Sequence, residues 1–283
     1  MFSTVRINCT VRDKKGIKEK SGTGFIFDFF RNPKDNVPVI VCNKHVIQNS
    51  IHGCFVFNSA DENGSPLFGQ PITCSFDEFI KNWIFHPDPT IDLAIMPIGG
   101  VVTRLMEERR RVYYTSISSS TIPQNEEWEK FIVLEQILVI GYPNALMDTV
   151  NNLSIFRKGT TASHPNIPFE GRNEFLVDVG VFPGSSGSPV FLLNKEFYEK
   201  SRELKEGPER GRLLGIISSG PMFTAEGIII ENEPQTEAFV TGQLAMSRIP
   251  MDIGIAIKST KLLDFKPILK EECAKLGIEI QDD

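Results

Sequence analysis

The 283-residue chain has few of the features that mark several common protein classes. It contains only four histidines, and no two of them have the spacing of a metal-binding pair. No glycine-rich dinucleotide fingerprint and no internal repeat of about 20 to 50 residues is present. Apolar runs are short, and none is long enough to span a membrane. We therefore expect no metal, no cofactor and no membrane partner.

Charge and cysteine usage narrow the setting further. The formal net charge of −6 argues weakly against a nucleic-acid partner. The five cysteines are odd in number and unevenly spread, which favours free thiols over a disulfide framework. The N-terminal residues show no charged segment followed by an apolar signal core. These features predict a cytoplasmic protein.

What the chain does have is many short apolar segments separated by turn signals. Glycine occurs 22 times and proline 18 times, and the apolar fraction is 41%. Short strand-like runs between turns indicate an all-β barrel or sandwich architecture. A chain of this length can bury two small cores in tandem.

The most informative segment is FPGSSGSP, residues 182–189, which follows the strand-like run FLVDV at residues 175–179. A serine hydroxyl needs a neighbouring base and N–H groups directed at the developing oxyanion, and glycines allow the tight turn that aims them. Ser186 is therefore a candidate nucleophile. For this string alone, an ordinary turn between two strands is the favoured interpretation.

Two other residues supply what such a serine requires. His45 follows the apolar run at residues 37–42, where a base would be held, and Asp92 opens a second apolar strand. The chain order His, Asp, Ser matches the chymotrypsin arrangement and differs from the order in α/β-hydrolases. Asp88, which lies between two prolines, is the weaker alternative to Asp92.

Several segments carry a family resemblance. The sequences SGTGF (residues 21–25), NKHV (43–46), DLA (92–94) and GSSGSP (184–189) resemble those of trypsin-like, chymotrypsin-fold serine peptidases of the PA clan. The chain is more similar to bacterial stand-alone and HtrA-type members than to digestive enzymes. GIISSG at residues 215–220 looks like the substrate-pairing strand of the family, and IGIAI at 253–257 looks like its last barrel strand.

The resemblance implies a fold and a domain plan. We expect an all-β protein with two six-stranded antiparallel Greek-key β-barrels and a C-terminal helix. The N-terminal barrel would cover residues 1–100 and the C-terminal barrel residues 131–258. A charged helix and linker would occupy residues 101–130, and the C-terminal helix and tail residues 259–283.

The resemblance also implies an activity, that of a serine endopeptidase acting on polypeptides through an acyl-enzyme. His45 would act as general base, Asp92 would orient it, and the N–H groups of Gly184 and Ser186 would form the oxyanion hole. The strand formed by Ser218, Ser219 and Gly220 would pair with the substrate. The alternatives are a catalytically silent peptide-binding or scaffold module and a hydrolase of esters.

Specificity and control are expected to differ from those of digestive trypsins. The primary pocket would have Gly180 at its base and Gly254 with residues 218–220 in its walls. This pocket has no charge, which favours apolar substrate residues unless Asp178 reaches it. Ser185 stands where digestive enzymes carry the aspartate that pairs with a newly cut N-terminus, so no such activation is expected. The insertions at residues 194–212 and 221–251 would either gate the site, with room for a regulatory protein partner, or form plain surface hairpins.

Overall fold

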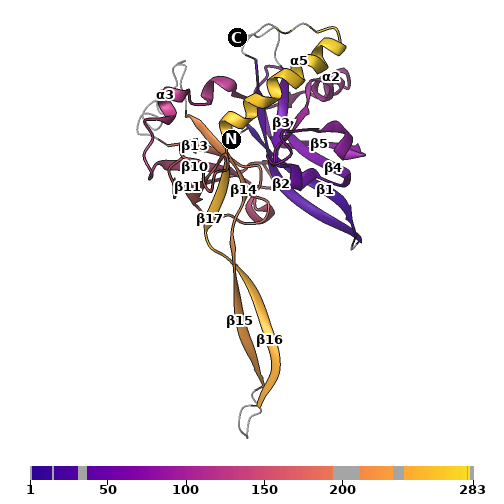
Figure 1. Ribbon diagram of the computed structural model, residues 1–283. Helices are drawn as coiled ribbons and strands as arrows, with labels where there is room; N and C mark the ends of the chain where they lie inside the picture. Colours follow the sequence, from indigo (N-terminus) through magenta and orange to yellow (C-terminus); the bar gives the residue numbers. More distant parts are fainter. Residues whose placement is uncertain are drawn as a thin grey trace.

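The computed structural model describes residues 2–14, 16–30, 37–193, 211–231, 239–278 and 280, with side chains omitted at 227–231 and 239–245. Two β-rich halves lie side by side, and a long two-stranded ribbon projects from them (Figure 1). The C-terminal helix lies across the opposite end of the molecule from this ribbon. The fold is mostly β, as predicted from the sequence.

The N-terminal half is built on one antiparallel-dominated sheet with nine strands, in the order β5-β4-β1-β2-β3-β7-β6, with β8 paired to β4 and β9 to β2. Their bounds are β1 Thr4–Asp13, β2 Gly16–Asp28, β3 Pro38–Cys42, β4 Ser50–Ala60, β5 Pro66–Asp77, β6 Ile84–Phe85, β7 Ala94–Pro97, β8 Val112–Tyr113 and β9 Ile117–Ser118. The sequence predicted six strands here. The short strands β8 and β9 come from the segment expected to be a linker, and each pairs with a longer strand of this sheet.

The C-terminal half is a closed barrel of six strands, in the order β10-β11-β12-β17-β14-β13. Their bounds are β10 Gln136–Gly141, β11 Ile155–Thr161, β12 Glu174–Asp178, β13 Pro189–Leu192, β14 Leu213–Ser219 and β17 Ile253–Lys258. This confirms the six-stranded barrel predicted for this part of the chain. Closure leaves no free sheet edge except where a strand runs past its neighbour.

The two halves share a hydrophobic core. Phe25 and Phe27 of β2, and Phe29 directly after it, alternate with Ile26, so the phenylalanines face the C-terminal half while Ile26 packs inside the N-terminal half. All four side chains have no exposed surface. Burial of an apolar side chain of this size contributes about 1.5–3 kcal/mol, so the shared core holds the two halves in one relative position.

Helical segments are short, and the two longest α-helices have nine and ten residues. The α-helices are α1 Lys44–Ile47, α2 Gly99–Glu107, α3 Asn125–Trp128 and α5 Lys266–Lys275, and the 3₁₀ turns are η1 Phe79–Asn82, η2 Ser119–Thr121, η3 Pro143–Ala145 and η4 Ser259–Phe265. The predicted C-terminal helix is present, and Phe265 and Leu269 join the core between the halves. The helical segment begins with η4 after Lys258, and no side chain caps this start with a hydrogen bond.

The insertion predicted at residues 221–251 forms the projecting ribbon of β15 (Met222–Glu231) and β16 (Phe239–Pro250). Among the described residues these two strands pair only with each other. Most of the other insertion, residues 194–210, lies outside the described residues.

Candidate active site

Three side chains predicted from the sequence meet where the two halves face each other. His45 Nδ1 lies 2.5 Å from Asp92 Oδ2, and His45 Nε2 lies 3.1 Å from Ser186 Oγ. His45 and Asp92 come from the N-terminal half, and Ser186 comes from the loop that precedes β13. The imidazole therefore bridges a carboxylate and a hydroxyl across the junction.

Hydrogen bonds that involve the main chain hold His45 and Asp92 in place. The His45 backbone N–H donates to Asp92 Oδ1 over 2.9 Å, and the Asn43 side-chain amide donates to the Asp92 carbonyl over 2.8 Å. Asn43 is fully buried and directly follows β3. Asp92 thus contacts both the main chain and the ring of His45, which sets the orientation of the imidazole.

The nucleophile loop depends on glycine at two positions. Gly184 and Gly187 both have φ of +89°, a conformation that other residues adopt with strain. A Cβ on Gly184 would lie 2.5 Å from the Tyr142 carbonyl oxygen, and one on Gly187 would lie 1.9 Å from that of Thr23. Close backbone packing therefore excludes side chains at positions 184 and 187 of this loop.

The backbone of this loop presents two N–H groups beside the serine. The Pro183 carbonyl oxygen accepts a 2.6 Å hydrogen bond from Asn144 N–H. Since N–H and C=O point in opposite directions across a trans peptide, Gly184 N–H points away from Asn144. In the described part of the chain, neither Gly184 N–H nor Ser186 N–H has a hydrogen-bond acceptor. Two unpaired donors at this turn are the arrangement that binds an oxyanion.

Thr23 holds the loop, a role that the sequence did not assign. Its N–H donates to the Ser186 carbonyl and its hydroxyl donates to the Gly184 carbonyl, both over 2.8 Å. The same hydroxyl accepts from Tyr142 N–H over 3.1 Å and from Ser188 Oγ over 3.3 Å. Thr23 lies within the SGTGF segment that carried the family resemblance, but its contacts are distant in sequence. It is fully buried and ties β2 to the nucleophile loop.

Arg157 braces the loop from the other side. Its guanidinium donates to the Gly180 carbonyl and, over 3.2 Å, to Ser185 Oγ. Burial lowers the pKa of Arg157 from its usual value, and no carboxylate forms an ion pair with it in the described part of the chain. Digestive enzymes carry at the position of Ser185 an aspartate that pairs with a newly cut N-terminus. In this protein Ser185 contacts the guanidinium of Arg157 instead.

The strand expected to receive substrate runs directly beside the serine. Ile217 exchanges hydrogen bonds with Gly187 and Ser188, where pairing between β13 and β14 ends. Beyond that point the Ser218 carbonyl oxygen lies 3.1 Å from Ser186 Oγ. Residues Ser218, Ser219 and Gly220 thus continue past the last β13 contact with one edge open.

Val181 lies between two walls of the predicted specificity pocket. A Cβ on Gly220 would lie 3.1 Å from Val181 Cβ, and one on Gly254 would lie 2.6 Å from Val181 Cγ2. Val181, which is 8% exposed, therefore fills the space between these two walls.

A carboxylate lies near the predicted base of this pocket. A Cβ on Gly180 would lie 3.4 Å from Asp252 Oδ1, and the Asp252 side chain is exposed, so an uncharged pocket stays a prediction. Asp178 does not supply this carboxylate, because its side chain is exposed while Val177 and Val179 on either side are buried. Strand alternation turns Asp178 away from the barrel interior.

The other candidates lie elsewhere. Asp88 accepts hydrogen bonds from the N–H and hydroxyl of Thr90, which lower its pKa. Cys42 is fully buried beneath Gly187, and burial raises its pKa well above the usual value, so it is a core thiol. His86 is buried, with Nε2 3.0 Å from the Lys261 carbonyl oxygen.

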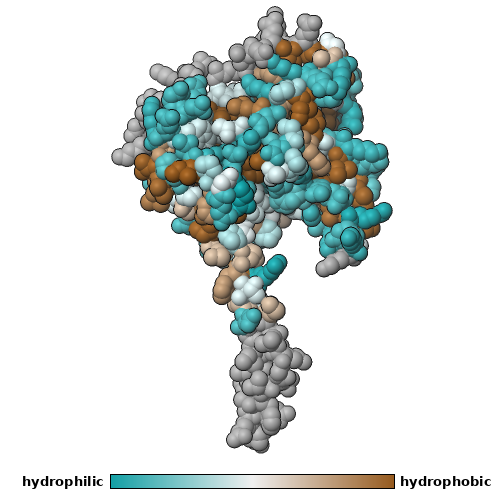
Figure 2. Space-filling view, in the orientation of Figure 1, coloured by the Kyte–Doolittle hydropathy of each residue, from teal (hydrophilic) through white to brown (hydrophobic). Residues whose placement is uncertain are grey.

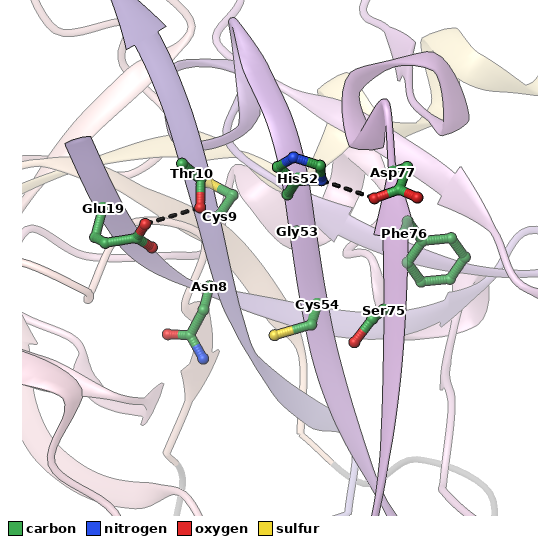
Figure 3. Close-up of a pocket in the computed structure, with 10 residues that line it drawn as sticks. All are labelled: Asn8, Cys9, Thr10, Glu19, His52, Gly53, Cys54, Ser75, Phe76 and Asp77. Atoms are coloured by element: carbon green, nitrogen blue, oxygen red, sulfur yellow. Dashed lines mark hydrogen bonds and ion pairs between the residues drawn. The ribbon is translucent and has the colours of Figure 1, made fainter. Parts of the chain in front are cut away.

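A separate groove of about 310 Å³ crosses β2, β1, β4 and β5 (Figure 3). It contains His52, whose Nδ1 lies 2.8 Å from Asp77 Oδ1. The residues that line this groove include no serine of the nucleophile loop.

In the part of the chain that the structure describes, no three His, Cys, Asp or Glu side chains gather to hold a metal ion. Within the same residues, no helix has the length and apolar character to cross a membrane.

Comparisons with known proteins agree with this geometry. A family model described as "Trypsin-like peptidase domain" matches residues 22–197, more than half of the chain. The chain therefore belongs to the trypsin-like peptidase domain family. No curated protein sequence matches it.

Solved structures of HtrA-type proteases are similar to the chain at low sequence identity. A variant of the HtrA-type protease AlgW with tripeptide matches with a TM-score of 0.50 and 12% identity, covering 99% of this chain and 70% of that chain. AlgW with tripeptide gives 0.46 and 12%, covering 98% and 62%. The AlgW variant with decapeptide gives 0.48 and 13%, covering 99% and 66%.

Proposed function

We propose that this protein is a serine endopeptidase that cleaves polypeptides through an acyl-enzyme intermediate. The observation that carries the proposal is the His45 ring, which lies within hydrogen-bond distance of both Asp92 and Ser186. Membership of the trypsin-like peptidase family gives the same chemistry independent support.

In the proposed reaction, Ser186 Oγ attacks the scissile carbonyl carbon while His45 Nε2 takes its proton. Asp92 holds the ring so that Nε2 faces the serine, and stabilises the imidazolium that forms. The unpaired N–H groups of Gly184 and Ser186 stabilise the oxyanion. His45 then protonates the leaving amine, and water releases the acyl group through the reverse proton transfers.

The substrate would bind as an added antiparallel strand against Ser218, Ser219 and Gly220. The open edge there provides main-chain donors and acceptors that do not depend on the substrate's side chains. Two of the similar HtrA-type structures contain a tripeptide and a decapeptide, which is consistent with recognition of an extended peptide. The described cysteines are all free, which fits our proposal of a reducing, cytoplasmic setting.

The test is covalent labelling of the purified protein with a fluorophosphonate, followed by mapping of the labelled residue. We expect labelling at Ser186 alone, and none in Ser186→Ala, whose unfolding transition should match that of the wild type. Labelling at Ser185 or Ser188 would show that the wrong serine was assigned. A folded protein that neither reacts nor cleaves would instead be the catalytically silent binding module.

A further inference from the structure

The projecting ribbon continues the strand pair beside the proposed active site. On the barrel, Ile217 of β14 pairs with Ala256 of β17, and the same two chain segments pair again as β15 with β16, starting at Met222 and Pro250. Met251 N–H donates to the Pro221 carbonyl over 3.2 Å and connects the two regions. Figure 1 shows the ribbon leaving the barrel at the ends of β14 and β17.

The open edge beside Ser186 therefore continues along β15. β13 covers that edge of β14 only as far as Ile217, and among the described residues no strand other than β16 pairs with β15. β16 lies on the same side as β17. From Ser218 outward, no described residue pairs with the edge of the strand on the active-site side.

The register shows which groups this edge presents. In an antiparallel pair, alternate residues direct both N–H and C=O toward the partner strand. The bond from Met251 to Pro221 places Pro221, and by alternation Phe223 and Ala225, among the residues that face β16. Gly220, Met222 and Thr224 therefore direct their N–H and C=O groups toward the free edge.

Proline at position 221 does not interrupt this edge. The donor that proline lacks would point at β16, not at the free side.

The same alternation gives the ribbon two chemically different faces at its base. Phe223, Ile249 and Met251 share one face with Pro221, and they are 58%, 48% and 54% exposed. Figure 2 shows apolar residues where the ribbon leaves the barrel.

We propose that β15 extends the substrate-binding strand, so that a polypeptide substrate pairs with it for several residues on the N-terminal side of the cut bond. This inference rests on the proposed function. If the third residue before the cut bond lies opposite Gly220, the fifth lies opposite Met222 and the seventh opposite Thr224. The fourth and sixth residues then lie on the apolar face with Pro221 and Phe223, where apolar side chains would be buried.

Physical considerations favour a strand as the occupant of this edge. An isolated two-stranded ribbon is marginally stable in water, and a third strand adds a row of hydrogen bonds and covers exposed apolar surface. The substrate already pairs with the adjoining residues in the proposed mechanism, so extending it by a few residues requires no change of direction. The partner is thus an extended, unfolded segment with apolar residues at alternate positions.

The test uses synthetic peptides with the same residues around the cut bond. One begins three residues before the bond and the others begin seven residues before it. We expect the long peptide to have a kcat/KM about tenfold above that of the short one, the gain from one to two additional hydrogen-bonded pairs. N-methylation of the fifth residue before the bond should remove this gain. N-methylation of the sixth, whose N–H points away from β15, should preserve it.

Variants of the ribbon give a matched comparison. Met222→Pro deletes a donor from the free edge, whereas Met222→Ala keeps that donor and removes only the side chain. We expect the long-to-short ratio of kcat/KM to fall to about one in the first variant and to stay near the wild-type ratio in the second. The wild-type measurements with N-methylated peptides stand even if Met222→Pro disturbs the ribbon.

Binding to Ser186→Ala, measured by fluorescence anisotropy with the same peptides, separates the two proposals. Suppose that Ser186→Ala binds the long peptide tightly, that this binding needs the N–H of the fifth residue before the bond, and that the wild-type protein does not cleave the peptide. This result would support the free edge as a binding site and refute the endopeptidase. Equal kcat/KM for long and short peptides, or equal losses from N-methylation at the fifth and sixth residues, would refute the edge while leaving the endopeptidase in place.

Discussion

Replacement of Thr23 by valine tests whether β2 holds the nucleophile loop. Valine keeps the shape of threonine and removes the hydroxyl, so no cavity forms. The Gly184 carbonyl, the Tyr142 N–H and the Ser188 hydroxyl lose the partner that Thr23 Oγ1 provides, in a region with no exposed surface at these side chains. A buried polar group left without a partner costs about 1–3 kcal/mol, so these losses lower the free energy of unfolding by about 2–4 kcal/mol if the loop relaxes and the Ser188 hydroxyl rotates to a new partner.

The effect on catalysis follows from the same bonds. If the Gly184 carbonyl turns toward a new partner, the peptide units around Gly184 rotate and its N–H no longer faces the oxyanion position. Loss of one such donor lowers kcat by about 10²–10³ in a well-studied protease. We therefore expect a fall in kcat of about 10²-fold, with a much smaller change in KM because the substrate strand does not contact Thr23.

The assay combines urea unfolding with steady-state kinetics on one peptide substrate. Thr23→Ser is the matched control, since it keeps the hydroxyl and loses one buried methyl group, at about 1 kcal/mol. It should retain most of kcat. Wild-type kcat and an unchanged unfolding free energy in Thr23→Val would show that the hydroxyl does not position the loop.

Three further outcomes follow from the site. Asp92→Asn should lower kcat by about 10⁴, by analogy with the established triad template, and a near-normal rate in a stopped assay would remove Asp92 from the mechanism. Burial raises the pKa of the Cys42 thiol well above its usual value, so Cys42 should stay protonated and unreactive toward iodoacetamide up to about pH 8.5. Peptidase activity should survive this treatment. Loss of activity together with alkylation at Cys42 would contradict the prediction. Val181→Gly should widen the specificity pocket. In a peptide library, kcat/KM for leucine or phenylalanine directly before the cut bond should rise at least about tenfold relative to valine. An unchanged profile would show that Val181 does not limit the pocket.

The sequence predicted the family, the mostly β fold and the C-terminal barrel because those depend on local patterns. Ser186 lies in a loop whose two glycines the backbone requires, and that requirement is visible as a motif. Apolar runs bounded by turns are equally local, so the strands of the barrel could be placed. His45 and Asp92 were selected by chain order and flanking strands, and the structure brings both to Ser186.

What the sequence could not supply depends on contacts between distant residues. Thr23 bonds the nucleophile loop across more than a hundred residues, and nothing beside it in the sequence marks that role. Val181 lies between Gly220 and Gly254 only because β14 and β17 pair in the barrel. Asp252 lies near Gly180 only because β17 pairs with β12. The ribbon was predicted as either a gate or a hairpin, because neither its direction nor its free edge follows from composition.

Because β2 contributes to the core of the N-terminal half and to the core between the halves, we expect the two halves to unfold as one cooperative unit. Phe25 and Phe27 belong to the core between the halves, while Ile26 belongs to the core of the first sheet. Separating the two halves would therefore expose one face of β2. The amide hydrogens of this strand are therefore protected until the whole molecule unfolds, whereas those on the outer edge of the ribbon exchange with solvent freely. In a molecule organised in this way, the junction that holds His45, Asp92 and Ser186 can open only when the whole fold is lost.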